Sequence, residues 1–351
     1  MSKFYNQKLN ALVAYTPGEQ PKNREYIKLN TNECAYAPSA KVAAAINEAA
    51  AYIHLYPDPT CDALCEKMAE ISGMEKEQII FTNGSDEILN FIFAAFCENG
   101  AVFPDITYGF YPVFANLNGV AYREIPLAED LSIRPEDYCG VGKTIFIANP
   151  NAPTGMMLCR EELERIIRSN PDNIVVIDEA YADFSGESAR ELVNKYDNLI
   201  VCGTFSKSRS AAGIRLGFAF ASKALIADLN TIRFSTNPYN INALTMAAGL
   251  AILDDETYTA ENVAKTVRTR ERMKEIFMRE GFACTDSKAN FLFVKSEKIS
   301  GEALYRGLKE RGILVRHFSL ERIKQYNRIT VGTDAQMDTL IQTIKEMVGT
   351  I

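Results

Sequence analysis

Short apolar segments alternate with longer amphipathic segments between about residue 40 and residue 250. This alternation is typical of βα units, which build a mainly parallel sheet covered by helices on both faces. Several apolar runs show little polar alternation and therefore predict buried strands. They span residues 78–82, 144–148, 174–178, 199–203 and 217–221. The predicted fold class is therefore α/β, with a large domain built around a mainly parallel sheet that helices flank.

The rest of the chain has a different pattern. A long segment at about 255–280 is rich in Arg, Lys and Glu and predicts a helix, and three strands follow it in a βαβ-like order, at 289–294, 313–316 and 328–331. The first 30 residues contain Pro17, Gly18 and Pro21 and predict an extended arm that packs on this region or on a neighbouring subunit. We expect an arm at 1–40, a large domain at 41–250 and a smaller α/β domain at 251–351.

Composition excludes several classes of protein. The chain has 351 residues, of which 47% are apolar and 24% are charged, so it is neither disordered nor collagen-like. Its formal net charge is −7, which provides no basic field for a phosphate backbone. We therefore expect a packed globular protein that does not bind nucleic acid.

Neither a membrane nor a metal is expected as a partner. The longest apolar run, 88–97, is interrupted by Asn90 and is too short to span a bilayer, and the chain start lacks the apolar stretch of a signal peptide. Eight cysteines occur without a CxxC pair, which suits a reducing compartment. Cys61, Cys65 and His54 are too few ligands for zinc. These observations predict a cytoplasmic protein without a metal site.

Polar segments directly follow the predicted strands. They span residues 83–86, 149–155, 178–181 and 204–207. Ligands of open α/β sheets bind outside the carboxyl ends of the strands. We therefore expect the chemistry of this protein at one edge of the large sheet.

An aromatic cluster lies between the first and the second of these polar segments. Its members are Tyr108, Phe110, Tyr111 and Phe114. Core packing is the expected role of all of them except Tyr108, for which packing and a role in the site are equally open.

Each polar segment has an ordinary structural interpretation when taken alone. Lys207 is either a surface lysine or an amine that is desolvated enough to attack an aldehyde. Asp178 ends an apolar strand and is either a structural ion-pair partner or a functional acid. The segment 84–86 opens a predicted helix and is either a plain N-cap or a phosphate site. Arg215, together with Ser206, is placed to reach the same phosphate.

Taken together, these segments describe one cofactor. Pyridoxal phosphate needs a lysine for its aldehyde, an acid for its ring nitrogen, a donor for its ring oxygen and a cup for its phosphate. Lys207, Asp178 and Tyr181 supply the first three groups. The predicted phosphate cup consists of Gly84, Ser85, Asp86, Ser206 and Arg215.

The segments that carry a family resemblance run nearly from end to end. They are Lys28–Glu33, Tyr56–Asp58, Asn83–Glu87, Thr107–Gly109, Pro150–Gly155, Asp178–Tyr181, Ser206–Lys207, Gly213–Arg215, Ala289–Phe291 and Arg328–Thr333. In these segments the chain resembles the fold-type I, aspartate-aminotransferase-like enzymes, and within them the histidinol-phosphate aminotransferase family.

The resemblance implies an activity and a set of site residues. It implies a pyridoxal-phosphate transaminase of histidine biosynthesis that exchanges an amino group between histidinol phosphate and 2-oxoglutarate. Lys207 would hold the cofactor and then move a proton, and the enzyme would be a homodimer with shared active sites. Further cofactor contacts implied by the resemblance are Tyr108, Thr204, Asn151 and, from the neighbouring subunit, Tyr56. The implied substrate-binding residues are Arg328, Arg316, Tyr15 and Asn32.

Two segments depart from the family pattern. The family often places Asn directly before Pro-Thr-Gly to bond the ring oxygen, whereas this chain has Ala152 there and Asn151 one position earlier. The substrate-facing segment of the family is also altered at residues 34–38, which read Cys-Ala-Tyr-Ala-Pro.

Other activities remain open from the sequence alone. Decarboxylation of threonine phosphate and transamination of aromatic amino acids use the same cofactor in enzymes that resemble this chain. A non-catalytic α/β binding protein with a structural lysine is the alternative from another class.

Overall fold

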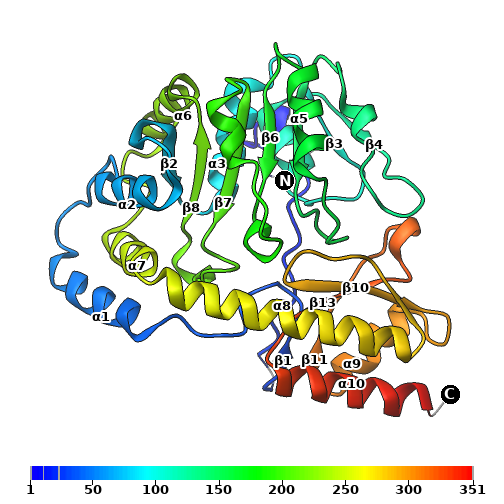
Figure 1. Cartoon of the computed structure of the whole chain (residues 1–351). Coiled ribbons are helices and arrows are strands. Elements are labelled where there is room, and N and C mark those ends of the chain that lie inside the picture. Colours follow the sequence, from blue (N-terminus) through cyan, green and yellow to red (C-terminus); the bar gives the residue numbers. More distant parts are fainter. Residues whose placement is uncertain (1, 11, 23, 350–351) are drawn as a thin grey trace.

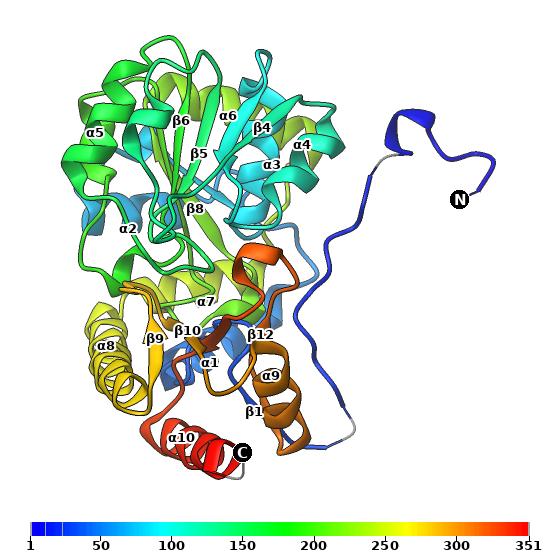
Figure 2. The ribbon, with the colours of Figure 1, turned by 90° about the vertical axis from the view of Figure 1, so that its right-hand side faces the viewer.

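The computed structural model describes residues 2–10, 12–22 and 24–349. Figures 1 and 2 show a large sheet with helices on both sides, stacked on a smaller body of strands and helices. The long helix α8 (Glu256–Arg279) runs beneath the large sheet and leads from one body to the other (Figure 1).

The large sheet is mixed but mainly parallel. Its strand order is β2-β8-β7-β6-β5-β3-β4, and β8 is antiparallel to both of its neighbours, whereas the other neighbouring pairs are parallel. The strands are β2 (Ile79–Thr82), β3 (Ala101–Pro104), β4 (Tyr122–Ile125), β5 (Thr144–Ala148), β6 (Val175–Asp178), β7 (Leu199–Thr204) and β8 (Gly217–Ala221). The α/β fold class with a mainly parallel sheet is thus confirmed.

Alternate strand residues point into two separate cores. Ile145 and Ile147 belong to one core and Phe146 to the other, where its ring stacks on that of Phe93 at a centroid distance of 4.2 Å. Helices α2, α5 and α7 contribute to the first core, and α3, α4 and α6 to the second. The helices of this body are α1 (Ala40–Ala49), α2 (Asp62–Ser72), α3 (Ser85–Phe96), α4 (Tyr111–Asn118), α5 (Arg160–Ser169), α6 (Lys223–Thr236) and α7 (Ala243–Leu253). Because both sheet faces are covered, the strands read as continuous apolar runs.

The smaller body contains an antiparallel sheet of order β12-β13-β10-β9. Its elements, with the short pair β1 and β11, are β1 (Ile27–Lys28), β9 (Phe282–Cys284), β10 (Phe291–Ser296), α9 (Gly301–Glu310), β11 (Ile313–Leu314), β12 (Arg316–His317), β13 (Asn327–Thr330) and α10 (Asp334–Gly349). The expected βαβ order is present in a split form: β10 and β12 are both antiparallel to β13, which lies between them.

The N-terminal segment is tied to the smaller body. Strand β1 pairs in parallel with β11, and Leu29 is buried in the core formed by α8, α9, α10 and the small sheet. Residues 12–22 run alongside the molecule, and residues 2–10 project away from it (Figure 2).

The reversal of β8 brings two distant segments to one edge. Thr204 at the end of β7 lies opposite Gly217 at the start of β8, so the connection between them stands at the carboxyl edge of the parallel strands. Gly217 is also opposite Thr82, where β2 gives way to helix α3. The carboxyl ends of β2, β5, β6 and β7 therefore meet the β7–β8 connection, as expected for a ligand site.

The described part of the chain offers neither a membrane-spanning helix nor a metal-binding cluster. None of its helices combines the length and apolar character needed to cross a membrane. The same residues contain no cluster of three or more His, Cys, Asp or Glu side chains that could hold a metal ion.

Gly217 provides a test of how the edge is assembled. A Cβ at this position would lie 2.3 Å from the backbone nitrogen of Ser85 and 2.4 Å from the carbonyl carbon of Gly84. We expect Gly217→Ala to push the start of α3 away and to lower the free energy of unfolding by about 1–3 kcal/mol, as overpacking does. Thermal unfolding measures this effect. Gly213→Ala is the matched control, because a Cβ there meets no atom within 4 Å, and an equal loss in both variants would contradict the expectation.

Candidate active site

A cavity of about 300 Å³ lies at the carboxyl edge of the large sheet. Side chains from the ends of β5, β6 and β7 and from the start of α3 line it together with the N-terminal segment. Predicted cofactor residues in its wall are Ser85, Asp86, Tyr108, Asp178, Tyr181, Thr204, Ser206, Lys207 and Arg215. Segments that are far apart in the sequence therefore meet around one space.

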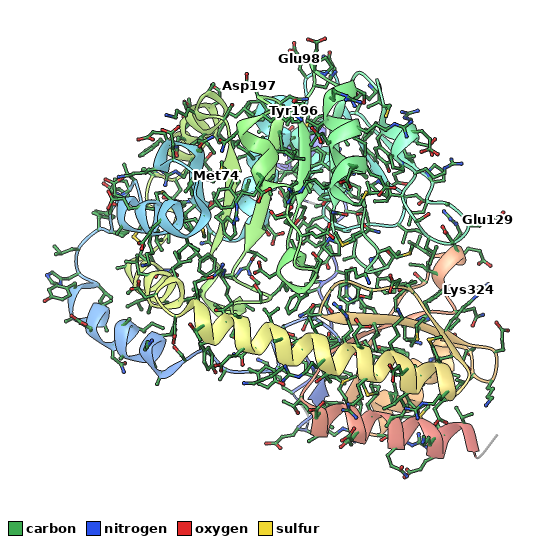
Figure 3. The ribbon with its side chains drawn as sticks, in the orientation of Figure 1. Met74, Glu98, Glu129, Tyr196, Asp197 and Lys324 are labelled. Carbon is green, nitrogen blue, oxygen red and sulfur yellow. The ribbon has the colours of Figure 1, made fainter. Side chains whose placement is uncertain are left out.

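A different cavity occupies the opposite edge of the sheet. It measures about 410 Å³ and includes Glu98 and Asp197, which lie at the end of the molecule that is remote from the smaller body (Figure 3). Its described lining contains no Lys, Arg or His to attract an anion. The predicted chemistry therefore belongs to the carboxyl edge.

Lys207 lies between two cavities. Its side chain lines the first cavity and also a second one of about 320 Å³ on the side of the smaller body. The Nζ atom donates a hydrogen bond to the carbonyl oxygen of Thr31 at 3.1 Å and lies 5.9 Å from the centre of the Tyr181 ring. The amine is thus held in place and borders both spaces.

Asp178 is a buried carboxylate without a cationic partner. It ends β6, is 5% exposed, and forms no ion pair with any described residue. Its Oδ1 accepts a hydrogen bond from the backbone N–H of Ala180, and its Oδ2 accepts one from the hydroxyl of Tyr111, both at 3.1 Å. Burial raises the pKa of Asp178 to about 6, although both hydrogen bonds oppose this shift.

The phosphate cup is built on the start of α3. Gly84 is the N-cap with a φ of 76°, and the first N–H groups of a helix have no acceptor within the helix. The guanidinium of Arg215 donates to Ser206 Oγ at 3.2 Å and to Asp86 Oδ2 at 3.4 Å. A Cβ on residue 84 would lie 2.5 Å from Nη2 of Arg215. Glycine therefore allows the cation to approach the helix start, which creates a cradle for a small anion.

Two tyrosines border the same space. The hydroxyl of Tyr108 donates to Asp86 Oδ1 at 2.6 Å, and its ring lines both cavities. The hydroxyl of Tyr181 accepts a hydrogen bond from Nδ2 of Asn32 at 2.9 Å. Asn32 in turn accepts one from the hydroxyl of Thr330 at 3.0 Å, so it orients Tyr181 from the smaller body.

Asn151 does not line the first cavity, and its expected contact with the ring oxygen stays a prediction. Its Nδ2 donates to the carbonyl of Ile106 at 2.9 Å and to Thr154 Oγ1 at 3.2 Å, and its Oδ1 accepts from Thr107 at 2.7 Å. The side chain is 1% exposed, and its amide is satisfied by Thr154 in its own loop and by Ile106 and Thr107 in the segment after β3. Ala152 instead forms part of the cavity wall.

Tyr56 also lies outside both cavities of this chain. Its side chain is 82% exposed and its ring stacks on that of Tyr239 at a centroid distance of 4.5 Å. The exposed side chains of the same segment, Tyr52, Ile53 and Leu55, form an exposed apolar patch with Tyr56 and Tyr239.

The second cavity contains two arginines that lack carboxylate partners among the described residues. Arg316 and Arg328 are directly opposed on β12 and β13, and both line the cavity. Arg328 donates from Nη2 to the carbonyl of Asn30 at 3.0 Å, but its buried Nε has no partner in the part of the chain that the structure describes. Like charges that face each other across a sheet repel, so this site favours an anion.

The other predicted substrate residues also line this cavity. Tyr15 stacks on Phe110 at a centroid distance of 4.1 Å, and Asn32 is placed at the cavity wall with a left-handed φ of 59°. The structure thus brings Tyr15, Asn32, Arg316 and Arg328 together next to Lys207.

Sequence reasoning missed several residues of the site. The carbonyl of Thr31 is a backbone group, so its residue type carries no signal. Glu33, which lines the first cavity and pairs with Lys28, lies in a segment that the resemblance covered without assigning it a role. Tyr111 was expected in the core, where it does pack, and its bond to Asp178 is invisible in the apolar pattern.

Comparisons with known proteins agree with this geometry. The family model described as aminotransferase class I and II matches residues 24–344. A histidinol-phosphate aminotransferase of Brachyspira hyodysenteriae is 47% identical over 352 residues, covering 99% of each chain. Histidinol-phosphate aminotransferase 2 of Dechloromonas aromatica is 44% identical, covering 99% of this chain and 100% of the other.

A solved structure supports the fold. The histidinol-phosphate aminotransferase of Sinorhizobium meliloti, crystallised in complex with pyridoxal 5′-phosphate, superposes with a TM-score of 0.91 at 23% identity. The match covers 100% of this chain and 99% of the other.

The position of Lys207 can be tested chemically. We expect borohydride to fix the predicted cofactor to the wild-type protein, and Lys207→Ala to abolish this labelling and lower turnover by about 10²- to 10⁴-fold. Mass spectrometry of the labelled peptide identifies the lysine. Lys223→Ala should keep the label, because Lys223 is exposed and pairs with Glu75. Labelling of another lysine in the Lys207 variant would refute the assignment.

Proposed function

The chain belongs to the aminotransferase class I and II family, and from this premise we propose that it transfers the amino group between histidinol phosphate and 2-oxoglutarate. This is a step of histidine biosynthesis, with pyridoxal 5′-phosphate as cofactor. The observation that carries the proposal is the pair of adjacent cavities that share Lys207, one with a phosphate cradle and a buried acid, the other with two arginines that lack carboxylate partners in the described chain.

The residues of the first cavity fit the cofactor. When bound, pyridoxal phosphate supplies an aldehyde for the amino group and a ring that withdraws electrons. The helix start at Gly84, with Ser206 and Arg215, would bind the phosphate, and Asp178 would hold a proton on the ring nitrogen. Tyr181 would donate to the ring oxygen, since its hydroxyl accepts from Asn32 and keeps its own proton available.

Lys207 would act as the proton carrier. Its Nζ borders both cavities and is oriented by the Thr31 carbonyl, so the free amine can take a proton from the substrate Cα and return it on the cofactor side. Tyr108 would stack on the cofactor ring, since its own ring lines the first cavity and its hydroxyl is anchored on Asp86.

The two arginines would recognise the anionic end of each substrate in turn. Histidinol phosphate carries a phosphate and 2-oxoglutarate a distal carboxylate, and both anions suit guanidinium donors. One pocket can then serve both half-reactions. Tyr15, whose ring stacks on Phe110 at the cavity wall, would contact the rest of the substrate.

The alternatives have less support. Threonine-phosphate decarboxylation and aromatic transamination would use the same first cavity, so that cavity does not favour them over the proposed reaction. The relatives that match this chain over its whole length at 44% and 47% identity are histidinol-phosphate aminotransferases. A non-catalytic binding protein would not need an amine between two cavities.

We further propose a cytoplasmic homodimer with shared sites. The exposed apolar patch around Tyr56 is an area that a second copy would cover. Tyr56 is outside the cavities of its own chain, which suits a side chain that reaches the site of its partner. The eight cysteines are free thiols, which suits a reducing compartment.

Half-reactions test the substrate assignment. We expect histidinol phosphate to convert the bound cofactor to its aminated form, with loss of visible absorbance, and 2-oxoglutarate to restore it. Arg328→Ala should weaken both half-reactions by about 10- to 100-fold, because a charged hydrogen bond to each anion is lost. Arg306→Ala is the control, since Arg306 is exposed and pairs with Glu302. Release of carbon dioxide from threonine phosphate without any reaction of histidinol phosphate would favour the decarboxylase.

Subunit mixing tests the shared site. Tyr56→Phe and Lys207→Ala variants should each be impaired, and mixing them should restore part of the activity. A mixed dimer would contain one site with both defects and one site with neither. Sedimentation should show a dimer at working concentration. A monomer, or no recovery after exchange of subunits, would contradict the proposal.

A further inference from the structure

Asp178 depends on one side chain that the predicted site did not include. Its Oδ2 accepts a hydrogen bond from the hydroxyl of Tyr111 at 3.1 Å, and its Oδ1 is bonded by the backbone N–H of Ala180. Among the described residues, the side chain that donates a hydrogen bond to the Asp178 carboxylate is therefore Tyr111. A buried carboxylate requires such donors because it has lost its water.

The ring of Tyr111 has no freedom to swing away. It is completely buried at the first position of α4, and its ring centre lies 5.6 Å from Phe103, 5.6 Å from Phe146 and 5.7 Å from Tyr108. These contacts fix the ring among three other aromatic rings, and one of them, Tyr108, lines the cavity. The hydroxyl is therefore presented to Asp178 in a fixed direction.

The hydroxyl can act only as a donor toward this acid. Burial and the negative charge of Asp178 raise the pKa of Tyr111 well above its usual value, so the phenol keeps its proton over the whole working range. Each carboxylate oxygen offers two lone pairs. With one used by Tyr111 and one by Ala180, the carboxylate retains acceptor capacity for a third donor in the cavity.

We propose that Tyr111 is a positioning residue that orients Asp178 and keeps it ionised, so that the acid can hold a proton on the ring nitrogen of pyridoxal phosphate. This inference rests on the proposed function, because it assumes that cofactor. A phenol donor stabilises the charged form of the carboxylate without neutralising it, whereas a lysine or arginine in the same place would compete with the ring nitrogen for the negative charge.

Loss of the Tyr111 hydroxyl should have an effect that depends on pH, whereas loss of simple packing would not. Burial already raises the pKa of Asp178 to about 6, and the Tyr111 hydrogen bond lowers it. Without that bond the pKa rises further, and the acid becomes neutral over a wider range below and around neutral pH. At high pH the carboxylate is ionised with or without the donor, so the difference between the two proteins disappears.

Tyr111→Phe tests this pH dependence, because it removes the hydroxyl and keeps the ring. Apoprotein is titrated with pyridoxal phosphate between about pH 6 and pH 9, and affinities are expressed as the ratio of wild type to variant, so that titration of the free cofactor cancels. A hydrogen bond to a charged group is worth about one to two powers of ten. We expect binding to be about 5- to 50-fold weaker at pH 6 and within about twofold of wild type at pH 9.

Tyr138→Phe is the matched control. Tyr138 is a buried tyrosine of the large body whose hydroxyl has no hydrogen-bond partner in the described chain, and it lines neither cavity of the site. This variant should bind the cofactor like wild type at every pH. An Asp178→Asn background provides the second control: there the pH-dependent part of the Tyr111→Phe effect should vanish, since the amide does not titrate.

A readout without cofactor completes the test. Infrared difference spectra of the apoprotein record protonated carboxyl bands, and the band that Asp178→Asn removes belongs to Asp178 and not to its buried neighbour Glu179, whose pKa burial raises to about 7. The Asp178 band should appear at higher pH in Tyr111→Phe than in wild type. An equal loss of affinity at pH 6 and pH 9, or an unshifted carboxyl band, would overturn the proposal. If wild type itself binds no pyridoxal phosphate, the proposed function fails instead, and the infrared titration still decides whether Tyr111 controls Asp178.

Discussion

The direction of one strand decides where the charges of this protein meet. Because β8 runs antiparallel between β7 and β2, the chain that leaves β7 returns to the same edge, and Thr204 is opposite Gly217. Had β8 been parallel, its start would lie at the far edge, and Arg215 with it. The reversal therefore brings the β7–β8 connection to the start of α3, where only a glycine at position 217 leaves room for the backbone of Gly84 and Ser85.

Each cavity is organised around charge that the protein leaves without an ion-pair partner. In the first, Asp178 is held by a phenol and a backbone amide and has no cation against it. In the second, Arg316 and Arg328 face each other, and Arg328 is bonded to a carbonyl oxygen and not to an acid. Neutral partners hold the geometry of these groups and leave most of their electrostatic attraction for a ligand. Lys207 stands between the two regions, bonded likewise to a carbonyl.

The sequence predicted the parts of this structure that depend on continuous apolar runs. The strands β2, β5, β6, β7 and β8 were found because both of their faces are covered, and the segments after them contain most of the cavity wall. Strands β3 and β4 were missed, since β3 has four residues and ends in Pro104, and β4 is an edge strand with three exposed residues.

Side-chain detail was harder to predict than segments. Asn151 has the residue type expected of a cofactor ligand, but its amide bonds to Ile106 and Thr107 in the segment after β3, and no local pattern reveals these distant partners. For Tyr111 the apolar sequence around it predicted core packing, which is correct. That pattern does not show that the hydroxyl points at Asp178. Such contacts join residues 67 positions apart, so they depend on the assembled fold.

Residues 29–32 contact both bodies of the molecule. Leu29 is buried in the core of the smaller body, and Asn30 accepts the hydrogen bond of Arg328, whereas Thr31 holds Lys207 and Asn32 holds Tyr181 on the larger body. These four consecutive residues act as a linkage with little slack. A rotation of the smaller body against the sheet would therefore act on the amine of Lys207 through Thr31, and a shift of Arg328 would act on the neighbouring residue Asn30.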